Sequence, residues 1–186
     1  MNKIFQFGEE VKGYNIKVLN EREIRAAAGI LFVLLFISVM LALLKADFLM
    51  IKYSVTIFLT DLIIRVFINP KFAPTLILGR LIVSKQNPEY VGALQKKFAW
   101  SFGIIISGTA FALMVILNTY SPITGLICMI CLLFLLFESA FGICLGCIFY
   151  KIIYRKKAEY CPGETCDLRS REEIQKTSLT QIAVVL

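Results

Sequence analysis

The sequence contains no histidine. Histidine is the most common general base near neutral pH, and it also activates serine and cysteine nucleophiles and ligates metals. Its absence excludes Ser-His and Cys-His catalytic pairs and histidine-ligated metal centres. The sequence also has no phosphate-binding loop, dinucleotide-binding fingerprint, nucleophilic-serine elbow or haem attachment motif. Any chemistry must therefore depend on cysteines, carboxylates or the few other ionisable groups.

Charged residues are scarce as well. They make up 18% of the 186 residues, whereas hydrophobic residues make up 58%. A typical soluble domain has about 25% charged and about 45–50% apolar residues. The mean hydropathy of +0.76 points in the same direction. This composition disfavours a soluble globular enzyme, a disordered chain and a nucleic-acid-binding domain.

Four apolar runs are each about as long as the ~20 residues that cross the hydrocarbon core of a bilayer: 26–44, 48–68, 99–117 and 123–150. The second run carries Lys52, Asp61 and Arg65, and the fourth carries only Glu138. No proline interrupts any of them. Because backbone polar groups in lipid must be satisfied within the segment, each run predicts a helix. We therefore expect an all-α, polytopic membrane protein with four transmembrane helices arranged as two hairpins.

Lysine and arginine are unevenly distributed around these runs. They gather before the first, between the second and third, and after the fourth, whereas residues 118–124 carry no charge. The positive-inside rule therefore predicts that both termini and the middle loop are cytoplasmic. The net charge of +7 is then a topology signal, and we expect no nucleic-acid partner. The predicted organisation is a cytoplasmic N-terminal segment at 1–25, a four-helix transmembrane domain at 26–150 and a cysteine-containing cytoplasmic tail at 151–186.

The two hairpins have the same predicted orientation, which is compatible with a parallel internal repeat. Gly29 and Asp61 of the first hairpin then correspond to Gly103 and Glu138 of the second. This correspondence predicts that Asp61 and Glu138 face each other. Arg65 shares a helical face with Asp61, and a charge in lipid costs roughly 2.5–3.5 kcal/mol on insertion scales. Two interpretations stay open. In the first, Arg65 forms an ion pair with either acid and locks the helices together. In the second, all three residues line a substrate pathway.

Two cysteine pairs with C-x-x-C spacing lie in the fourth run. Cys144 and Cys147 are flanked by Gly142 and Gly146, a G-x-x-x-G spacing that favours close helix packing. In a continuous helix this pair lies near the inner, C-terminal end, so we do not expect a thioredoxin-type motif, which begins a helix. Cys128 and Cys131 lie near the outer end, and free cysteines there are expected to pack as small apolar side chains.

A third cysteine pair lies in the predicted tail. Cys161 and Cys166 enclose Pro-Gly-Glu-Thr, which predicts a tight turn that brings the sulfurs together. The cytoplasm is reducing, so a permanent disulfide is not expected. A redox-active dithiol, a sulfur relay or a four-thiolate zinc site with Cys144 and Cys147 remain open. We predict no bound metal and no cofactor.

Three segments resemble a bacterial membrane family catalogued as domain of unknown function 4395, over roughly residues 15–150. They are residues 20–29 (NEREIRAAAG), residues 61–80 with DLIIR, PKFAP and Gly-Arg, and residues 141–150 (FGICLGCIFY), which match a Phe-x-x-Cys-Leu-Gly-Cys-x-x-Tyr signature. The resemblance implies a multi-pass protein of the bacterial inner membrane. It also implies association with thioredoxin-like or rhodanese-like proteins, and that the position of Glu138 varies.

The sequence leaves three functions open. The first is thiol-redox or sulfur-handling chemistry, with the catalytic residues Cys144, Cys147, Cys161 and Cys166 exchanging with a cytoplasmic protein. The second is a small-solute transporter with Asp61, Arg65 and Glu138 in the pathway, for which four helices require a homodimer or larger assembly. The third is a membrane scaffold subunit without chemistry. Whether the chain is an enzyme is left open.

Overall fold

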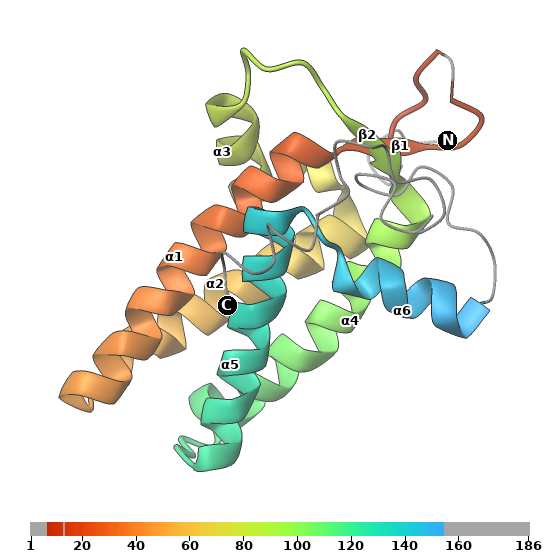
Figure 1. The fold of residues 1–186 in the computed structure, drawn as a ribbon. Helices are drawn as coiled ribbons and strands as arrows, with labels where there is room; N and C mark the ends of the chain where they lie inside the picture. Colours follow the sequence, from red (N-terminus) through yellow and green to blue (C-terminus); the bar gives the residue numbers. More distant parts are fainter. Residues whose placement is uncertain (1–6, 13, 155–186) are drawn as a thin grey trace, which may run out of the picture.

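The computed structural model describes residues 7–12 and 14–154, which form a bundle of helices with a small pair of strands at one end (Figure 1). The α-helices are α1 (Glu21–Lys45), α2 (Leu49–Ile63), α3 (Pro74–Ile82), α4 (Ala93–Phe111), α5 (Pro122–Leu136) and α6 (Leu145–Tyr154). One turn of π-helix extends α2, α4 and α5, as η2 (Ile64–Ile68), η4 (Ala112–Ile116) and η5 (Phe137–Phe141). A 3-10 turn, η3 (Pro70–Phe72), precedes α3.

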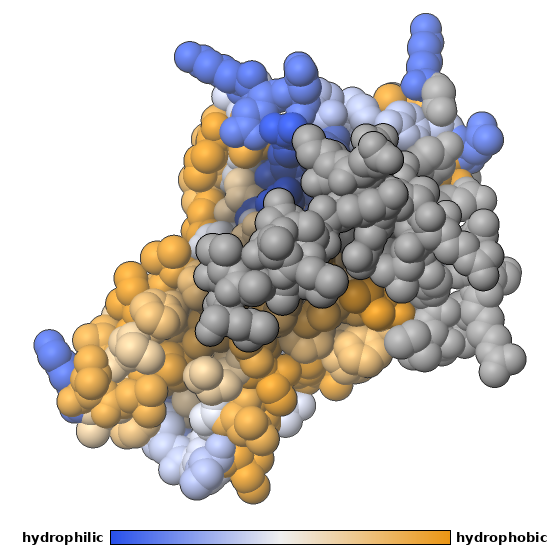
Figure 2. All heavy atoms as spheres, in the orientation of Figure 1, coloured by the Kyte–Doolittle hydropathy of each residue, from blue (hydrophilic) through white to orange (hydrophobic). Residues whose placement is uncertain are grey.

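Within residues 7–12 and 14–154, three helices are long and apolar enough to cross a membrane: Glu21–Lys45, Ala93–Ile116 and Pro122–Phe141. Their outward faces carry exposed hydrophobic side chains, such as Leu44 and Ile105, which are 81% and 65% exposed. Figure 2 shows hydrophobic residues over the body of the molecule and hydrophilic residues gathered at the end that holds the strands. Apolar exposure on this scale is typical of a surface that meets lipid. The chain is therefore an all-helical membrane protein in its fold class.

The membrane-length helices begin before the apolar runs. Asn20 caps α1 by accepting a hydrogen bond from the backbone N–H of Arg22, and acidic residues occupy the first turn. This is a typical helix start, since a side-chain oxygen and negative charge both compensate the free N–H groups there. The helix therefore starts at Glu21 rather than at residue 26, and α4 likewise starts at Ala93 rather than at residue 99. The expected loop between the second and third runs contains η3, α3 and a strand.

The fourth apolar run is not a single helix, and the prediction of one continuous helix over 123–150 is wrong. Gly142 adopts a left-handed conformation with φ of 66° and ends η5. The N–H of Ile143 then bonds back to the carbonyl of Phe137 at 3.0 Å, which closes the helix end. A new helix, α6, begins at Leu145 and packs along α4. Hydropathy alone gives no sign of this break, because both sides of it are apolar.

The short helix α6 lies directly on α4. A Cβ placed on Gly146 would overlap the Cβ of Ala99, so only glycine permits this approach. Rings on both sides hold the contact, with Phe98 and Tyr150 edge to face at 5.4 Å between ring centroids. The helix α3 makes the equivalent contact with α1, since a Cβ on Gly79 would meet the α1 backbone. Each short helix thus packs against a long helix that precedes it in the chain, α3 against α1 and α6 against α4.

The order of elements repeats along the chain. Strand β1 (Val18–Asn20) precedes α1, α2 and α3, and strand β2 (Tyr90–Gly92) precedes α4, α5 and α6. The two strands pair antiparallel, with Val18 opposite Gly92. Matching elements start at Val18 and Tyr90, Glu21 and Ala93, Leu49 and Pro122, and Pro74 and Leu145. In this register the second residues of η2 and η5 correspond, so Glu138 matches Arg65 and not Asp61.

The core lies where α1, α2, α4 and α5 meet. Its buried hydrophobic residues come from all four helices, and α1 contacts both α2 and α5 while α4 does the same. Small buried side chains such as Ser38 and Ser54 face each other between α1 and α2 and share a hydrogen bond. Close approach over small residues is typical of helix packing in membranes. This packing fixes the polar end of the bundle, where the candidate site lies.

Candidate functional site

Cys144 and Cys147 stand at the beginning of α6. Cys144 immediately precedes the first helical residue, and its carbonyl accepts hydrogen bonds from the backbone N–H of Cys147 at 3.0 Å and of Ile148 at 3.2 Å. The expectation that this C-x-x-C lies near the end of a helix, unlike the thioredoxin type, is therefore wrong. The break at Gly142 moves the pair to a helix N-terminus. The partial positive charge there favours a thiolate, whereas a helix C-terminus disfavours one.

A buried lysine ion-pair cluster lies beside the two cysteines. The Nζ atom of Lys96 is 2.8 Å from Oε2 of Glu21 and 2.8 Å from Oε1 of Glu138. Lys96 is 0% exposed, Glu21 is 1% exposed and Glu138 is 16% exposed. A charge so deeply buried is tolerated only when it is paired and hydrogen-bonded. The cluster joins the starts of α1 and α4 to the start of η5.

The pKa values of the two thiols are shifted in opposite directions. The Cys147 thiol donates a hydrogen bond to the Cys144 sulfur, and this contact lowers the pKa of Cys144. The Lys96 ammonium lowers the pKa of Cys144 further, while burial opposes both effects. The same hydrogen bond, together with burial, raises the pKa of Cys147. Cys144 is thus the thiol of the pair that loses its proton more readily, and Cys147 donates a hydrogen bond to it.

Arg25 holds the bend that places Cys144. Its guanidinium donates hydrogen bonds to the carbonyl of Ser139 at 3.5 Å and to the carbonyl of Ala140 at 3.3 Å. These carbonyls belong to the end of η5, where helix carbonyls lack partners within the helix. A Cβ on Gly142 would lie 3.2 Å from the Cζ atom of Arg25. Cation and glycine together fix the reversal of the chain ahead of the cysteine pair.

Both thiols are buried, with Cys144 5% and Cys147 2% exposed. They are free thiols, as are Cys128 and Cys131 in α5. Cys128 contacts the sulfur of Met114 at 3.6 Å in the core. Within residues 7–12 and 14–154, no three or more potential metal ligands are grouped. The predicted tail residues Cys161 and Cys166, and with them the four-thiolate alternative, lie outside the described residues.

Asp61 and Arg65 form a second buried network, with Thr75 at the start of α3. Arg65 donates to Asp61 Oδ2 at 2.7 Å and to Thr75 Oγ1 at 2.7 Å. Thr75 in turn donates its hydroxyl to Asp61 Oδ2 at 2.7 Å and its backbone N–H to Oδ1 at 3.0 Å. Both charged side chains are 2% exposed. Arg65 therefore pairs with Asp61 and not with Glu138, and the predicted meeting of Asp61 and Glu138 does not occur, since each has other partners.

Sequence reasoning missed three residues of the cysteine site: Glu21, Arg25 and Lys96. All three precede an apolar run, where lysine and arginine indicate membrane topology and a carboxylate is expected to be exposed. One signal in the sequence was available. Glu138 is a lone carboxylate in an otherwise apolar run, and such a group requires a cationic partner. The sequence offers several cations, and only the packing of α4 against η5 selects Lys96.

Comparison with known proteins gives one match. No curated protein and no solved structure matches the chain. The sequence profile of one family matches residues 19–155, from β1 to just past the end of α6. That stretch contains every described residue of both buried networks. The chain therefore belongs to the family described as domain of unknown function DUF4395.

Proposed function

We propose that this protein is a membrane thiol-redox or sulfur-handling protein in which Cys144 is the nucleophile and Cys147 the resolving thiol. The observation that carries the proposal is the position of the pair, in the first turn of α6 and beside the buried ammonium of Lys96. A helix N-terminus and a nearby cation both favour the thiolate, which is the reactive form. The hydrogen bond from Cys147 adds a third stabilising contact.

The exchange proceeds in two balanced steps. The Cys144 thiolate attacks one sulfur of a partner disulfide, so that a mixed disulfide forms and the partner's other sulfur leaves as a thiolate. Cys147 then loses its proton and attacks the Cys144 sulfur, which releases the partner's second thiolate. The partner gains two electrons and becomes a dithiol, and the Cys144–Cys147 pair becomes a disulfide. With a persulfide donor, the Cys144 thiolate attacks the terminal sulfur, the donor's S–S bond breaks and its thiolate leaves, so that Cys144 carries the persulfide.

The ion-pair cluster stabilises the negative charge of the site. One ammonium faces two carboxylates and two thiols, so the groups compete for a single positive charge. The proton that Cys147 loses passes to the departing thiolate of the partner, which becomes a thiol. Lys96 then stabilises whichever sulfur carries negative charge. Cys161 and Cys166 extend the proposal as the pair that exchanges with a thioredoxin-like or rhodanese-like cytoplasmic protein.

We place this chemistry at the cytoplasmic face of a bacterial inner membrane, in a protein with four spans, two hairpins and both termini inside. The helix formed by α2 and η2 is the fourth span. Its internal charges are neutralised within the protein by the Asp61–Arg65 pair, and Lys52 near its other end donates to Asn118 Oδ1 at 2.6 Å. The repeated order of elements and the antiparallel strand pair support a parallel internal repeat.

The network of Asp61, Arg65 and Thr75 supports the helix-locking interpretation over a transport pathway. Each charged group already has its partners, and both are sealed from solvent. One observation favours the transporter alternative: an interior cavity of about 60 Å³ lies between Arg65 and Glu138. A transporter requires that loss of Asp61 or Arg65 abolish function while loss of the cysteines does not. The thiol proposal requires the reverse.

The test is the redox state of each thiol in native membranes. Samples are reduced or oxidised, quenched with acid, denatured and alkylated with a mass tag. We expect oxidation to remove two tags at Cys144 and Cys147, and Cys147→Ser to accumulate a mixed disulfide or persulfide at Cys144. Cys128→Ser with Cys131→Ser is the matched control, because that pair has the same spacing within a continuous helix. Thiols at Cys144 and Cys147 that stay reduced and unmodified throughout would overturn the proposal.

A further inference from the structure

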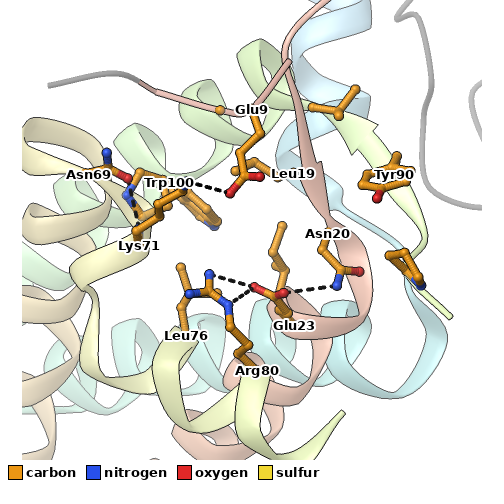
Figure 3. Close-up of a pocket in the computed structure, with 15 residues that line it drawn as sticks. Glu9, Leu19, Asn20, Glu23, Asn69, Lys71, Leu76, Arg80, Tyr90 and Trp100 are labelled. Atoms are coloured by element: carbon orange, nitrogen blue, oxygen red, sulfur yellow. Dashed lines mark hydrogen bonds and ion pairs between the residues drawn. The ribbon is translucent and has the colours of Figure 1, made fainter. Parts of the chain in front are cut away.

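A second cavity lies at the polar end of the bundle, apart from the cysteine pair. It has a volume of about 370 Å³, within the ~300–1,000 Å³ typical of small-molecule sites. Figure 3 shows Lys71, Arg80 and Trp100 on one side of it, with Asn20 and Tyr90 across the opening. These residues come from β1, β2, η3, α3 and α4, so both halves of the chain build the walls.

Trp100 presents a buried hydrogen-bond donor to this cavity. The residue is 3% exposed, and its Nε1 atom has no hydrogen-bond partner among the described residues. Figure 3 shows the indole reaching into the cavity. An indole N–H can only donate, so whatever satisfies it must be an acceptor. Buried donors are rarely left without one.

The ring is held in this position from two sides. Phe7 packs edge to face against it, with 5.8 Å between ring centroids. The guanidinium of Arg65 lies 5.0 Å from the ring centroid on the core side, as in a cation–π contact. The donor is therefore held between the ring of Phe7 and the guanidinium of Arg65, which is itself paired with Asp61.

Two cations line the same cavity as the indole. Nζ of Lys71 is 3.0 Å from Oε1 of Glu9, and both side chains are about half exposed. Arg80 donates to Oε2 of Glu23 through Nε at 3.1 Å and through Nη2 at 3.0 Å. The Lys71–Glu9 pair is exposed on both sides, and such pairs are weak and readily exchanged, whereas the Glu23 carboxylate of the second pair is 17% exposed. Lysine has three donors and arginine has five, so both keep donors available beside these contacts.

We propose that this cavity binds a small oxyanion, a phosphate, sulfate or carboxylate group, which accepts from the indole N–H of Trp100, from Lys71 and from Arg80. The oxyanion replaces Glu9 as the partner of Lys71, because that ion pair is exposed and weak. The same oxyanion chemistry has two sources, a dissolved anion or solute and the headgroup of an anionic lipid. The site is independent of the thiol chemistry, since it shares no residue with the cysteine cluster.

Intrinsic fluorescence gives a direct test, because Trp100 is the only tryptophan of the chain. The purified full-length protein in phosphatidylcholine nanodiscs is titrated with sulfate, inorganic phosphate or acetate at constant ionic strength. We expect a saturable change in emission with at least one anion. Lys71→Gln and Arg80→Gln should each raise the apparent Kd about tenfold, as for the loss of a charged hydrogen bond. Lys85→Gln, an exposed change of the same charge, is the matched control.

Two further experiments distinguish a dissolved anion from a lipid headgroup, and the indole donor from the ring packing of Trp100. In nanodiscs that contain phosphatidylglycerol, a lipid ligand predicts shifted emission without added anion and no further response to sulfate. Trp100→Phe keeps the ring packing and removes the donor, so anion-dependent thermal stabilisation should fall while the variant remains folded. Emission that responds to no anion or lipid, or that responds equally in wild type and both charge variants, would mean that the indole meets water only. Cys144→Ser should bind as the wild type does, whatever the outcome of the thiol test.

Discussion

Substituting Lys96 by Met tests the cysteine site most directly. The change removes a fully buried ammonium that contacts two carboxylates, each at 2.8 Å. Breaking a buried ion pair by removing one partner typically costs about 3–5 kcal/mol, because the other charge stays buried without compensation. Here Glu21 and Glu138 are left facing each other without a cation. The loss in the free energy of unfolding should therefore lie near the upper end of that range.

A second variant separates stability from reactivity. Lys96→Met combined with Glu21→Gln removes the most deeply buried orphaned carboxylate and leaves Glu138, which is partly exposed. We expect this double variant to recover more than half of the lost stability. Its Cys144 should nevertheless stay slow to alkylate at neutral pH, because the cation that helps to lower the pKa of Cys144 is still missing. Lys97→Met removes the same charge from the next residue and serves as the control.

The assays are chemical denaturation in mixed micelles and the pH dependence of Cys144 alkylation. The groups that face Cys144 are Cys147, Lys96, Glu138 and, through Lys96, Glu21. In the wild type the alkylation rate should level off at lower pH than for an ordinary thiol, since the pKa of Cys144 is lowered. In Lys96→Met the plateau should move to higher pH. The reasoning fails if Lys96→Met stays within about 1 kcal/mol of the wild type and leaves the pH profile unchanged.

Three other substitutions test the frame around the site. Gly146→Ala forces a methyl group into Ala99, so it should destabilise the protein by about 1–3 kcal/mol and speed alkylation at α6, which mass tagging over time measures. Gly142→Ala places a side chain at positive φ and should cost about 1–2 kcal/mol; an unchanged denaturation midpoint would show that the bend is not fixed there. Arg65→Met leaves Asp61 buried and should cost about 3–5 kcal/mol, whereas Arg65→Met with Asp61→Asn should regain part of that loss, and equal loss in both would contradict a locking ion pair.

Composition and hydropathy were sufficient to predict the class of protein. Lipid requires that backbone groups be satisfied within each segment, so long apolar runs predict helices whatever their neighbours are. Three such helices are present in the part of the chain that the structure describes. Family membership was also readable, because the signature FGICLGCIFY is specific in its spacing and requires no knowledge of contacts. The chemistry of the site was less accessible, although Cys144 and Cys147 stood out by their flanking glycines.

The tertiary structure decided what surrounds those cysteines. Gly142 could have been an ordinary position in an apolar helix, but it is left-handed, and Arg25 from α1 contacts the bend that it makes. That bend turns the C-terminal part of a predicted long helix into the N-terminus of a new one, and it reverses the sign of the local electrostatic effect on the thiols. The choice of Lys96 as the partner of Glu138 was equally a matter of packing.

The sequence by itself thus determined that this is a helical membrane protein, and it singled out a cysteine pair as candidate reactive atoms, because hydrophobicity and thiol chemistry are properties of single residues and short windows. Tertiary structure alone decided the register of the two halves, the pairing of Asp61 with Arg65, the burial of Lys96 and the cavity in front of Trp100. Apart from the i,i+4 pair of Asp61 and Arg65, which Thr75 of α3 completes, each of these features joins residues from different elements. Their energies depend on distance and burial. Neither quantity exists until the helices pack.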